Sequence, residues 1–165
     1  MVNVIIELPK IEDFKRVNEL AVQVHEIHVN WNPDLFRSVE EIFNKEYFKT
    51  RIDNKEIFIA KVNNEIAGYI LFNISEKDNP IMRYRKQLSI ESICVDEKIR
   101  SNGIGTALLE YVKKVGKENG CTDLYLTVNK ENENAIKVYE KFGFKVKNIA
   151  YMMKIWNGGM KDDNR

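Results

Sequence analysis

Apolar residues recur along this chain with two different periods, one typical of helices and one typical of strands. Between residues 11 and 28 they fall every three or four positions, which predicts an amphipathic helix. Elsewhere they form short, nearly continuous runs bounded by Gly, Asn, Pro or charged residues, and such runs predict strands. The predicted strands lie at 3–8, 56–62, 66–74, 88–95 and 123–128, and the run 144–156 predicts one long strand or two. The predicted helices lie at 11–28, from Ser38 to about Thr50, from the residues after Gly105 to about Asn119, and at 132–142.

Capping residues support several of these boundaries. Ser38 is followed three positions later by Glu41, which is the spacing of a capping box. Asn132 is a suitable N-cap for the last helix, and Gly143 is suited to end it. The polar stretch 75–87 contains a proline and predicts a loop. The resulting order is strand, two helices, three strands, helix, strand, helix, and one or two strands, which indicates an α/β protein with a mixed sheet.

The composition is that of an ordinary soluble globular domain. The chain has 165 residues, of which 44% are hydrophobic and 31% are charged, and its formal net charge is +1. We expect one domain over 1–157 and a polar tail over 158–165. The near-zero charge gives no reason to expect binding to nucleic acid or to an anionic membrane. The sequence has no run apolar enough for a membrane helix and no secretion signal at its start, so we expect a cytoplasmic location.

The two cysteines and two histidines do not predict a metal centre. Cys94 lies inside an apolar run and Cys121 follows a glycine, and this spacing matches neither a zinc site nor a redox pair. We therefore expect two reduced thiols. His25 and His28 are three residues apart on a predicted helix and could share a metal ion, but the sequence offers no third ligand.

The stretch RSNGIG at 100–105 is the strongest candidate for a ligand-binding segment. It leads into a predicted helix, where free backbone N–H groups and the helix dipole both favour an anion. A P-loop would need a Lys followed by Ser or Thr after its last glycine, and this chain has none there. A dinucleotide-binding turn would need a third glycine where Leu108 stands, and a tighter lead from Val95 into Gly103.

Two motifs together resemble the GNAT superfamily of N-acetyltransferases. The segment VDEKIRSNGIGTALL resembles the family's acyl-CoA signature, R/Q-x-x-G-x-G/A, with Arg100, Gly103 and Gly105 in its fixed positions. Downstream, NENAIKVYEKFGF resembles the family's N-x-x-A-x-x-x-Y-x-x-x-G-F. The matching residues of this second motif are Asn132, Ala135, Tyr139, Gly143 and Phe144. The resemblance implies a GNAT-type α/β fold, with a mixed central sheet of six or seven strands flanked by about four helices.

The resemblance also implies acetyl-CoA as co-substrate, without a metal. A pyrophosphate needs several converging N–H groups with no side chains in the way, which a glycine loop at a helix start supplies. By resemblance, the backbone of Ile93 and Val95 would pair with the extended, amide-rich pantetheine arm. The side chain of Arg100 either takes part in binding or only braces the loop. The expected cofactor-binding residues are Ile93, Cys94, Val95, Arg100, Ser101, Asn102, Gly103, Ile104, Gly105, Thr106, Asn132 and Tyr139.

Acetyl transfer to an amine calls for a base that takes the ammonium proton and an acid that protonates the departing thiolate. Tyr139 matches the family's Tyr and is the candidate acid, although a core aromatic would show the same apolar neighbours. Glu91 is the candidate base, acting directly or through water. Strand alternation places it on the face of Ser89, Ile93 and Val95, where apolar surroundings would make it a stronger base. The alternatives for this carboxylate are a surface wetted by the substrate groove and a contact to a charge on the substrate.

The remaining expectations concern the acceptor. Cys94 alternates onto the face opposite Glu91, which argues against an acyl-cysteine intermediate and for direct attack in a ternary complex. His28 and Trp31 fall where the resemblance places the acceptor pocket, with a capping histidine and a core tryptophan as alternatives. The acceptor is a small amine or a protein amine. A non-catalytic acyl-CoA-binding module is the alternative function, and edge strands within 144–156 would allow a homodimer.

Overall fold

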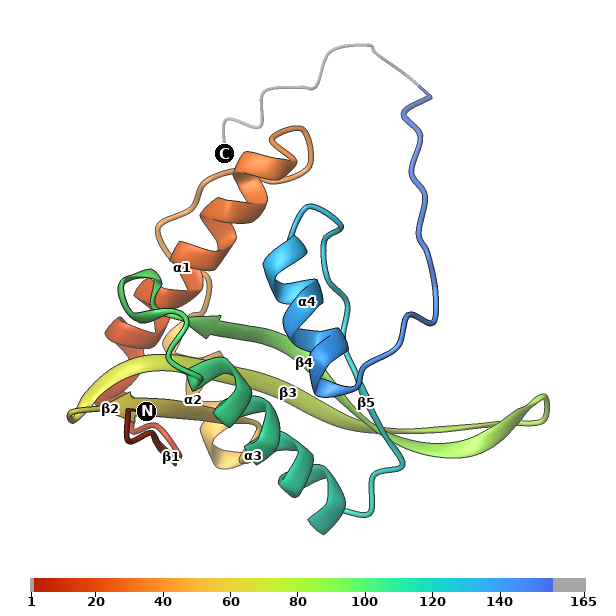
Figure 1. Cartoon of the computed structure of the whole chain (residues 1–165), viewed down its shortest axis with the longest axis horizontal. Helices are drawn as coiled ribbons and strands as arrows, with labels where there is room; N and C mark the ends of the chain where they lie inside the picture. Colours follow the sequence, from red (N-terminus) through yellow and green to blue (C-terminus); the bar gives the residue numbers. More distant parts are fainter. Residues whose placement is uncertain (1, 156–165) are drawn as a thin grey trace.

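The computed structural model describes residues 2–155 and contains one mixed sheet with helices on both sides (Figure 1). The strands follow the order β1-β2-β3-β4-β5, and all neighbours are antiparallel except β4 and β5, which are parallel. This confirms the predicted α/β class, although the described residues form five strands rather than six or seven. The strands are β1 (Ile5–Glu7), β2 (Ile57–Val62), β3 (Glu65–Asn79), β4 (Met82–Val95) and β5 (Asp123–Tyr125). The helices are η1 (Ile11–Asp13), α1 (Phe14–Trp31), α2 (Lys45–Asp53), η2 (Glu97–Ile99), α3 (Ile104–Glu118) and α4 (Glu133–Phe142), where η marks a 3-10 helix.

The central strands are buried on both faces, which explains why their sequences are almost continuously apolar. Helices α1 and α2 cover one face, and α3 covers the other (Figure 1). The α1-side core consists of Phe14, Val17, Leu20, Ala21, Phe43, Phe48, Ile57, Ile59, Ile66, Tyr69, Leu71 and Cys94. The α3-side core consists of Phe58, Ala60, Ala67, Ile70, Phe72, Leu88, Ile90, Ile104, Leu108, Leu109 and Val112.

The second helix begins later than the capping box at Ser38 predicts. Its N-cap is Asn44, whose side-chain oxygen accepts from the Tyr47 N–H at 2.7 Å. Ser38 instead donates to Glu26 of α1 at 2.9 Å. Asn18 of α1 explains the shift, because its side-chain oxygen accepts from two successive backbone N–H groups at residues 42 and 43. These two hydrogen bonds hold the segment before Asn44 in an irregular turn, so the helix begins only at Lys45.

The stretch predicted as a loop over 75–87 is part of a long β-hairpin. Strands β3 and β4 continue past the helices as a two-stranded arm that projects from the body in Figure 1. Charged residues face each other across this arm: Glu76 lies opposite Lys86, and Lys77 lies opposite Arg85. The arm has no buried face, so its sequence lacks the apolar alternation that marks half-buried strands.

The C-terminal run 144–156 does not form the predicted strand or strands in its described part. Residues 144–155 contain no strand and run away from the sheet (Figure 1). Apart from Phe144, which packs against the α3-side core, their apolar side chains are exposed, as for Tyr151 and Ile155. Alternation alone predicted a strand here, but a strand also needs a neighbouring edge to pair with. Residue 156 and the expected tail 158–165 lie outside the described residues.

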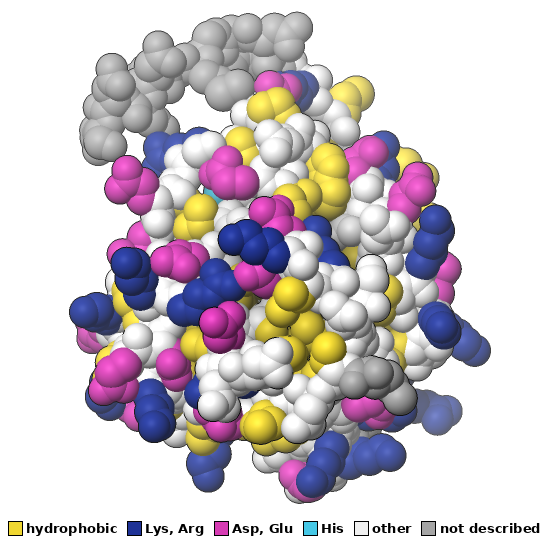
Figure 2. Space-filling view, turned by 60° about the vertical axis from the view of Figure 1, so that its left-hand side comes forward, with side chains coloured by type: hydrophobic (Ala, Val, Ile, Leu, Met, Phe, Trp, Pro, Cys, Tyr) yellow, Lys and Arg dark blue, Asp and Glu magenta, His cyan; other side chains and the backbone are white. Residues whose placement is uncertain are grey.

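The surface carries both signs of charge in close mixture. Figure 2 shows Lys and Arg side chains interleaved with Asp and Glu over the visible face, with apolar side chains between them. In the part of the chain that the structure describes, no helix combines the length and the apolar character needed to cross a membrane.

Candidate functional site

Strand β4 has an open edge along its last residues. Pairing with β5 covers only three positions and ends where Ser89 meets Tyr125, whereas β4 continues to Val95. The Asp96 N–H donates to the Ala67 carbonyl of β3 at 2.8 Å. Because backbone groups alternate in direction along a strand, those of Ile93 and Val95 point away from β3 and toward the open edge. The Val95 carbonyl accepts from Arg100 Nε at 3.2 Å, and the other outward groups of these two residues are the ones that an extended amide chain could pair with.

The open edge leads directly into the N-terminus of α3. Gly103 caps this helix with a φ of 79°, in the left-handed region that favours glycine. The first N–H groups of the helix have no partner within the helix, so they are available to an anion. A Cβ at Gly105 would meet only Val95 Cγ2, at an ordinary 3.7 Å. The packing of the chain therefore does not require a glycine at position 105, whereas close approach of a ligand to the backbone would.

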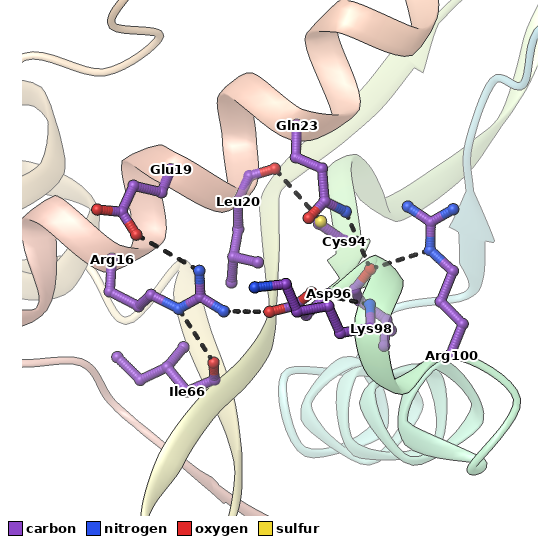
Figure 3. A network of polar contacts seen from close by, with 10 residues as sticks. Arg16, Glu19, Leu20, Gln23, Ile66, Cys94, Asp96, Lys98 and Arg100 are labelled. Atoms are coloured by element: carbon purple, nitrogen blue, oxygen red, sulfur yellow. Dashed lines mark hydrogen bonds and ion pairs between the residues drawn. The ribbon is translucent and has the colours of Figure 1, made fainter.

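Side chains around this loop brace it rather than point out of it (Figure 3). Arg100 Nε donates to the Val95 carbonyl at 3.2 Å, and the Asn102 amide donates to the Ile99 carbonyl at 3.0 Å. Both side chains are thus turned back onto the chain. Of the two possibilities for Arg100, the geometry matches bracing, and it leaves the backbone as the binding surface.

Helix α1 is attached to the same end of β4 by three contacts (Figure 3). Arg16 forms an ion pair with Asp96, the Cys94 thiol donates to the Leu20 carbonyl at 3.3 Å, and the Gln23 amide lies 3.5 Å from the Val95 carbonyl. Asp96 also caps η2 by accepting from the Lys98 N–H at 3.0 Å. That hydrogen bond, followed by the Arg16 guanidinium, lowers the pKa of Asp96.

Glu91 lies at a β-bulge, which overturns the strand alternation expected for it. Leu71 pairs with Ser92 and Phe72 pairs with Ile90, so Glu91 has no partner across the ladder. The bulge turns Glu91 to the face covered by α1 and α2, where it contacts α2. Ile93 and Val95 pack against the α3-side core instead. The expectation that Glu91 shares their face is wrong.

Cys94 is also on the α1 side, so the expectation that it lies opposite Glu91 is wrong as well. A different observation still argues against an acyl-cysteine route. The side chain is only 2% exposed, its thiol is engaged with the Leu20 carbonyl, and burial raises its pKa to about 12. The thiolate that such chemistry needs is therefore disfavoured.

Polar groups surround the Glu91 carboxylate, in place of the expected apolar surroundings. Arg51 Nη2 donates to one carboxylate oxygen at 2.9 Å, and the Asn73 amide donates to the other. Burial, and to a smaller extent the nearby Glu91 carboxylate, raises the pKa of Tyr47. Glu91 remains one-third exposed, with 33% of its side chain accessible. It can thus contact solvent while both of its oxygens are held.

Tyr139 is placed by a well-capped helix. Asn132 caps α4 by accepting from the Ala135 N–H at 3.2 Å, and Gly143 ends it with a φ of 111°. The Tyr139 ring packs edge-on against Phe144, with 5.8 Å between centroids, and both contact the α3-side core. Burial raises the pKa of Tyr139, so the phenol stays protonated at neutral pH.

His28 and Trp31 lie near the end of α1, which continues to Trp31, past the predicted end of the helix at residue 28. Their rings pack edge-on at 5.5 Å, and Phe36 lies 6.1 Å from His28. Burial, and secondarily His25, lowers the pKa of His28. The two residues belong to an aromatic cluster that contains a neutral imidazole.

The structure thus brings most of the predicted cofactor residues together and keeps one catalytic candidate apart. Residues 93, 95 and 100–106, together with Tyr139, lie on or next to the α3-side core, whereas Glu91 lies on the opposite face. Sequence reasoning missed Arg51, Asn73 and Asp96. Only the last has a local signal, as a capping residue; the others become neighbours of Glu91 only through the fold. Among the described residues, no group of three or more His, Cys, Asp or Glu side chains could hold a metal ion.

Comparison with known proteins identifies the family. A family model described as Acetyltransferase (GNAT) family matches residues 15–144. An N-alpha-acetyltransferase of Sulfurisphaera tokodaii is 39% identical over 94 residues, which are 53% of this chain and 55% of that protein. An uncharacterized N-acetyltransferase of Methanocaldococcus jannaschii is 31% identical over 106 residues, which are 63% of this chain and 46% of that protein.

A solved structure shares the fold of this chain. The crystal structure of a mutant Bacillus halodurans protein matches with a TM-score of 0.87 at 27% identity, covering 92% of this chain and 99% of that one. The chain spans about half the length of the two curated relatives above. The family model alone matches most of the chain, and its match includes the glycine loop and α4. The chain therefore belongs to the acetyltransferase (GNAT) family.

Proposed function

We propose that the chain is an N-acetyltransferase that moves the acetyl group of acetyl-CoA to a primary amine by direct attack in a ternary complex. The observation that carries this proposal is the open edge of β4, which runs straight into the glycine-capped N-terminus of α3. An extended amide arm and a pyrophosphate, joined in that order, would match this arrangement. Membership of the family supports the same reading.

The residues of the chain fit acetyl-CoA as the co-substrate. The outward backbone groups of Ile93 and the Val95 N–H would pair with pantetheine, and the N–H groups from Asn102 to Thr106 would hold the pyrophosphate. The open space at the Cβ positions of Gly103 and Gly105 supports this placement. When bound, acetyl-CoA supplies an activated thioester.

The proposed reaction is a single acetyl transfer with two accompanying proton transfers. A C–N bond forms between the amine and the acetyl carbon while the C–S bond breaks. Glu91 takes the amine proton, directly or through a water molecule, from the face covered by α1 and α2, and Tyr139 gives its proton to the departing sulfur from the α3 side. Each such group contributes about 10²–10⁴-fold in rate. Burial raises the pKa of Tyr139, so the phenol carries its proton at neutral pH, as an acid must, but it is also a weaker acid than free tyrosine.

The acceptor site is proposed at the end of α1, where His28 and Trp31 lie in the aromatic cluster. The relative named an N-alpha-acetyltransferase makes α-amino groups the first acceptors to test. Free amino acids, peptide N-termini, a lysine-containing peptide, polyamines and aminoglycosides form a suitable panel.

A thiol-release assay with acetyl-CoA and this panel tests the proposal. We expect amine-dependent thiol release, and a fall in kcat of about tenfold or more in Tyr139→Phe. Calorimetry should give the same acetyl-CoA affinity for both proteins. If acetyl-CoA binds but no acceptor, small or peptidic, releases thiol, the chain is an acyl-CoA-binding module. An unchanged kcat in Tyr139→Phe would remove that residue from the mechanism.

A further inference from the structure

Arg51 of α2 is a charged side chain that the fold has almost buried. Only 13% of it is exposed, and Phe48 is the only fully buried residue of its short helix. Placing a guanidinium away from water is costly unless it is paired and hydrogen-bonded. Its Nε is buried without a hydrogen-bond partner among the described residues, so the burial is not even fully compensated. The position of Arg51 therefore calls for an explanation other than packing.

The contacts of Arg51 converge on the Glu91 bulge. Its Nη2 atom donates both to Glu91, at 2.9 Å, and to the Phe72 carbonyl, at 2.6 Å. Phe72 is the residue of β3 at which the pairing with β4 shifts register. Nη1, the other terminal nitrogen of Arg51, lies 3.3 Å from the Glu56 carboxylate. The Arg51 guanidinium lies over the Tyr47 ring, 5.5 Å from the ring centroid. Arg51 thus binds the backbone of Phe72 in β3 and the side chain of Glu91 in β4, the two strands that meet at the bulge.

These contacts restrict a carboxylate that would otherwise be free to move. A bulged residue has no cross-strand neighbour to fix its side chain, and Glu91 is partly exposed. Arg51 holds one carboxylate oxygen and Asn73 holds the other, so the plane of the group is set. An ionised carboxylate has about four lone-pair positions. Arg51 and Asn73 occupy two of them, so there is room for a further donor. A water molecule or the acceptor amine would be that donor.

We propose that Arg51 is a positioning residue for Glu91, whose carboxylate it holds in a single orientation at the bulge. This inference rests on the proposed function, in which Glu91 accepts the proton of the amine. Three ionisable groups face Glu91 from the elements packed against it: Arg51 and Tyr47 from α2, and Glu56 just before β2. Arg51 is the only cation among them.

Substitution of Arg51 tests the inference through rate and pH dependence. In Arg51→Met we expect kcat to fall about tenfold or more, with the Kd of acetyl-CoA within about twofold of the parent. The acid limb of the kcat/KM profile should move to higher pH, because a carboxylate without its cation keeps its proton to higher pH. Arg51→Lys, which keeps the charge but loses the planar fork, should leave the limb in place and recover part of kcat.

Lys49→Met provides the matched control. It removes a cation from the same helix, but Lys49 is 66% exposed and pairs with Asp53 at 2.5 Å, away from Glu91. Its rate and pH profile should equal those of the parent. Thermal unfolding of all variants shows whether any has lost its fold, in which case Arg51→Lys carries the test.

Combination with Glu91→Gln separates a positioning role from a structural one. If Arg51 acts through Glu91, Arg51→Met should have no further effect on kcat in the Glu91→Gln background. An equal loss in both backgrounds, or a loss with an unmoved acid limb, would overturn the inference.

Carbon-13 NMR of the glutamate carboxyls gives a readout that does not depend on turnover. Glu91→Gln identifies the Glu91 signal, and Arg51→Met should shift its titration to higher pH. If the parent shows no turnover with any amine while this shift is present, the proposed function fails and the electrostatic link stands. If the signal titrates identically in parent and variant, the link itself is wrong.

Discussion

The packing of the protein does not explain why residue 105 is a glycine. A Cβ there would meet only Val95 Cγ2 at 3.7 Å, and the residue lies in the first turn of α3. We expect Gly105→Ala to fold at least as well as the parent, with a gain of up to about 1 kcal/mol from helix propensity. We also expect its acetyl-CoA Kd to rise about tenfold or more, because the added methyl separates the pyrophosphate from the N–H groups. Urea unfolding and calorimetry measure the two effects.

Gly116 offers a matched control for that substitution. It lies in the same helix, and an added Cβ would make ordinary contacts to Leu124 and Leu88, at 3.5 Å and 3.6 Å. Gly116→Ala should therefore leave acetyl-CoA binding unchanged. If Gly105→Ala also binds like the parent, the pyrophosphate does not sit at this helix start.

At the scale of elements, the sequence predicts those helices and strands whose buried faces require an apolar pattern. The apolar periods of α1, α3 and α4 mark faces that pack against the sheet, and the glycine loop was identified because its chemistry is local. The hairpin arm was missed because neither of its faces is buried. Strict alternation through SIESICV does not predict the bulge at Glu91, although the adjacent polar residues Glu91 and Ser92 break the alternation there. Arg51 and Asn73 become partners of Glu91 only through the fold. Run 144–155 has the pattern of a strand, but no neighbouring strand pairs with it among the described residues.

The attachment of α1 to the end of β4 makes Asp96 a link between two elements. Its carboxylate binds Arg16 of α1 and caps η2, at the start of the cofactor loop. In Asp96→Ala both contacts are lost, and we expect a loss of about 1–3 kcal/mol in the free energy of unfolding. Acetyl-CoA affinity should also fall, since the loop loses its attachment. Urea unfolding and calorimetry on the same variant measure both effects.

Asp53→Ala is the comparison for Asp96. Asp53 is 59% exposed and pairs with Lys49 on the surface of α2, so its loss should cost less than about 1 kcal/mol and leave binding intact. Equal behaviour of the two variants would mean that the α1–β4 contact contributes no more than an ordinary surface pair.

For the whole molecule, the buried ionisable groups set the stability at alkaline pH. Burial raises the pKa of Cys94 from 9.0 to about 12 and also raises that of Tyr69. Because the unfolded chain releases these protons first, their contribution to stability is complete below about pH 9 and is lost as pH rises toward 12. Each proton contributes a slope of at most about 1.4 kcal/mol per pH unit.

Cys94→Ser isolates one of these groups. The serine hydroxyl can still donate to the Leu20 carbonyl but does not ionise in this range, so its protein should show a shallower fall of unfolding free energy between pH 9 and 11. Urea unfolding at a series of pH values gives the slope. Cys121→Ser is the control: its thiol is more exposed, and burial raises its pKa by less, so the slope should change less. If Cys94→Ser keeps the slope of the parent, the thiol ionises as readily in the folded protein as in the unfolded chain. The close contact between α1 and β4 that shields it would then open at alkaline pH before the molecule unfolds.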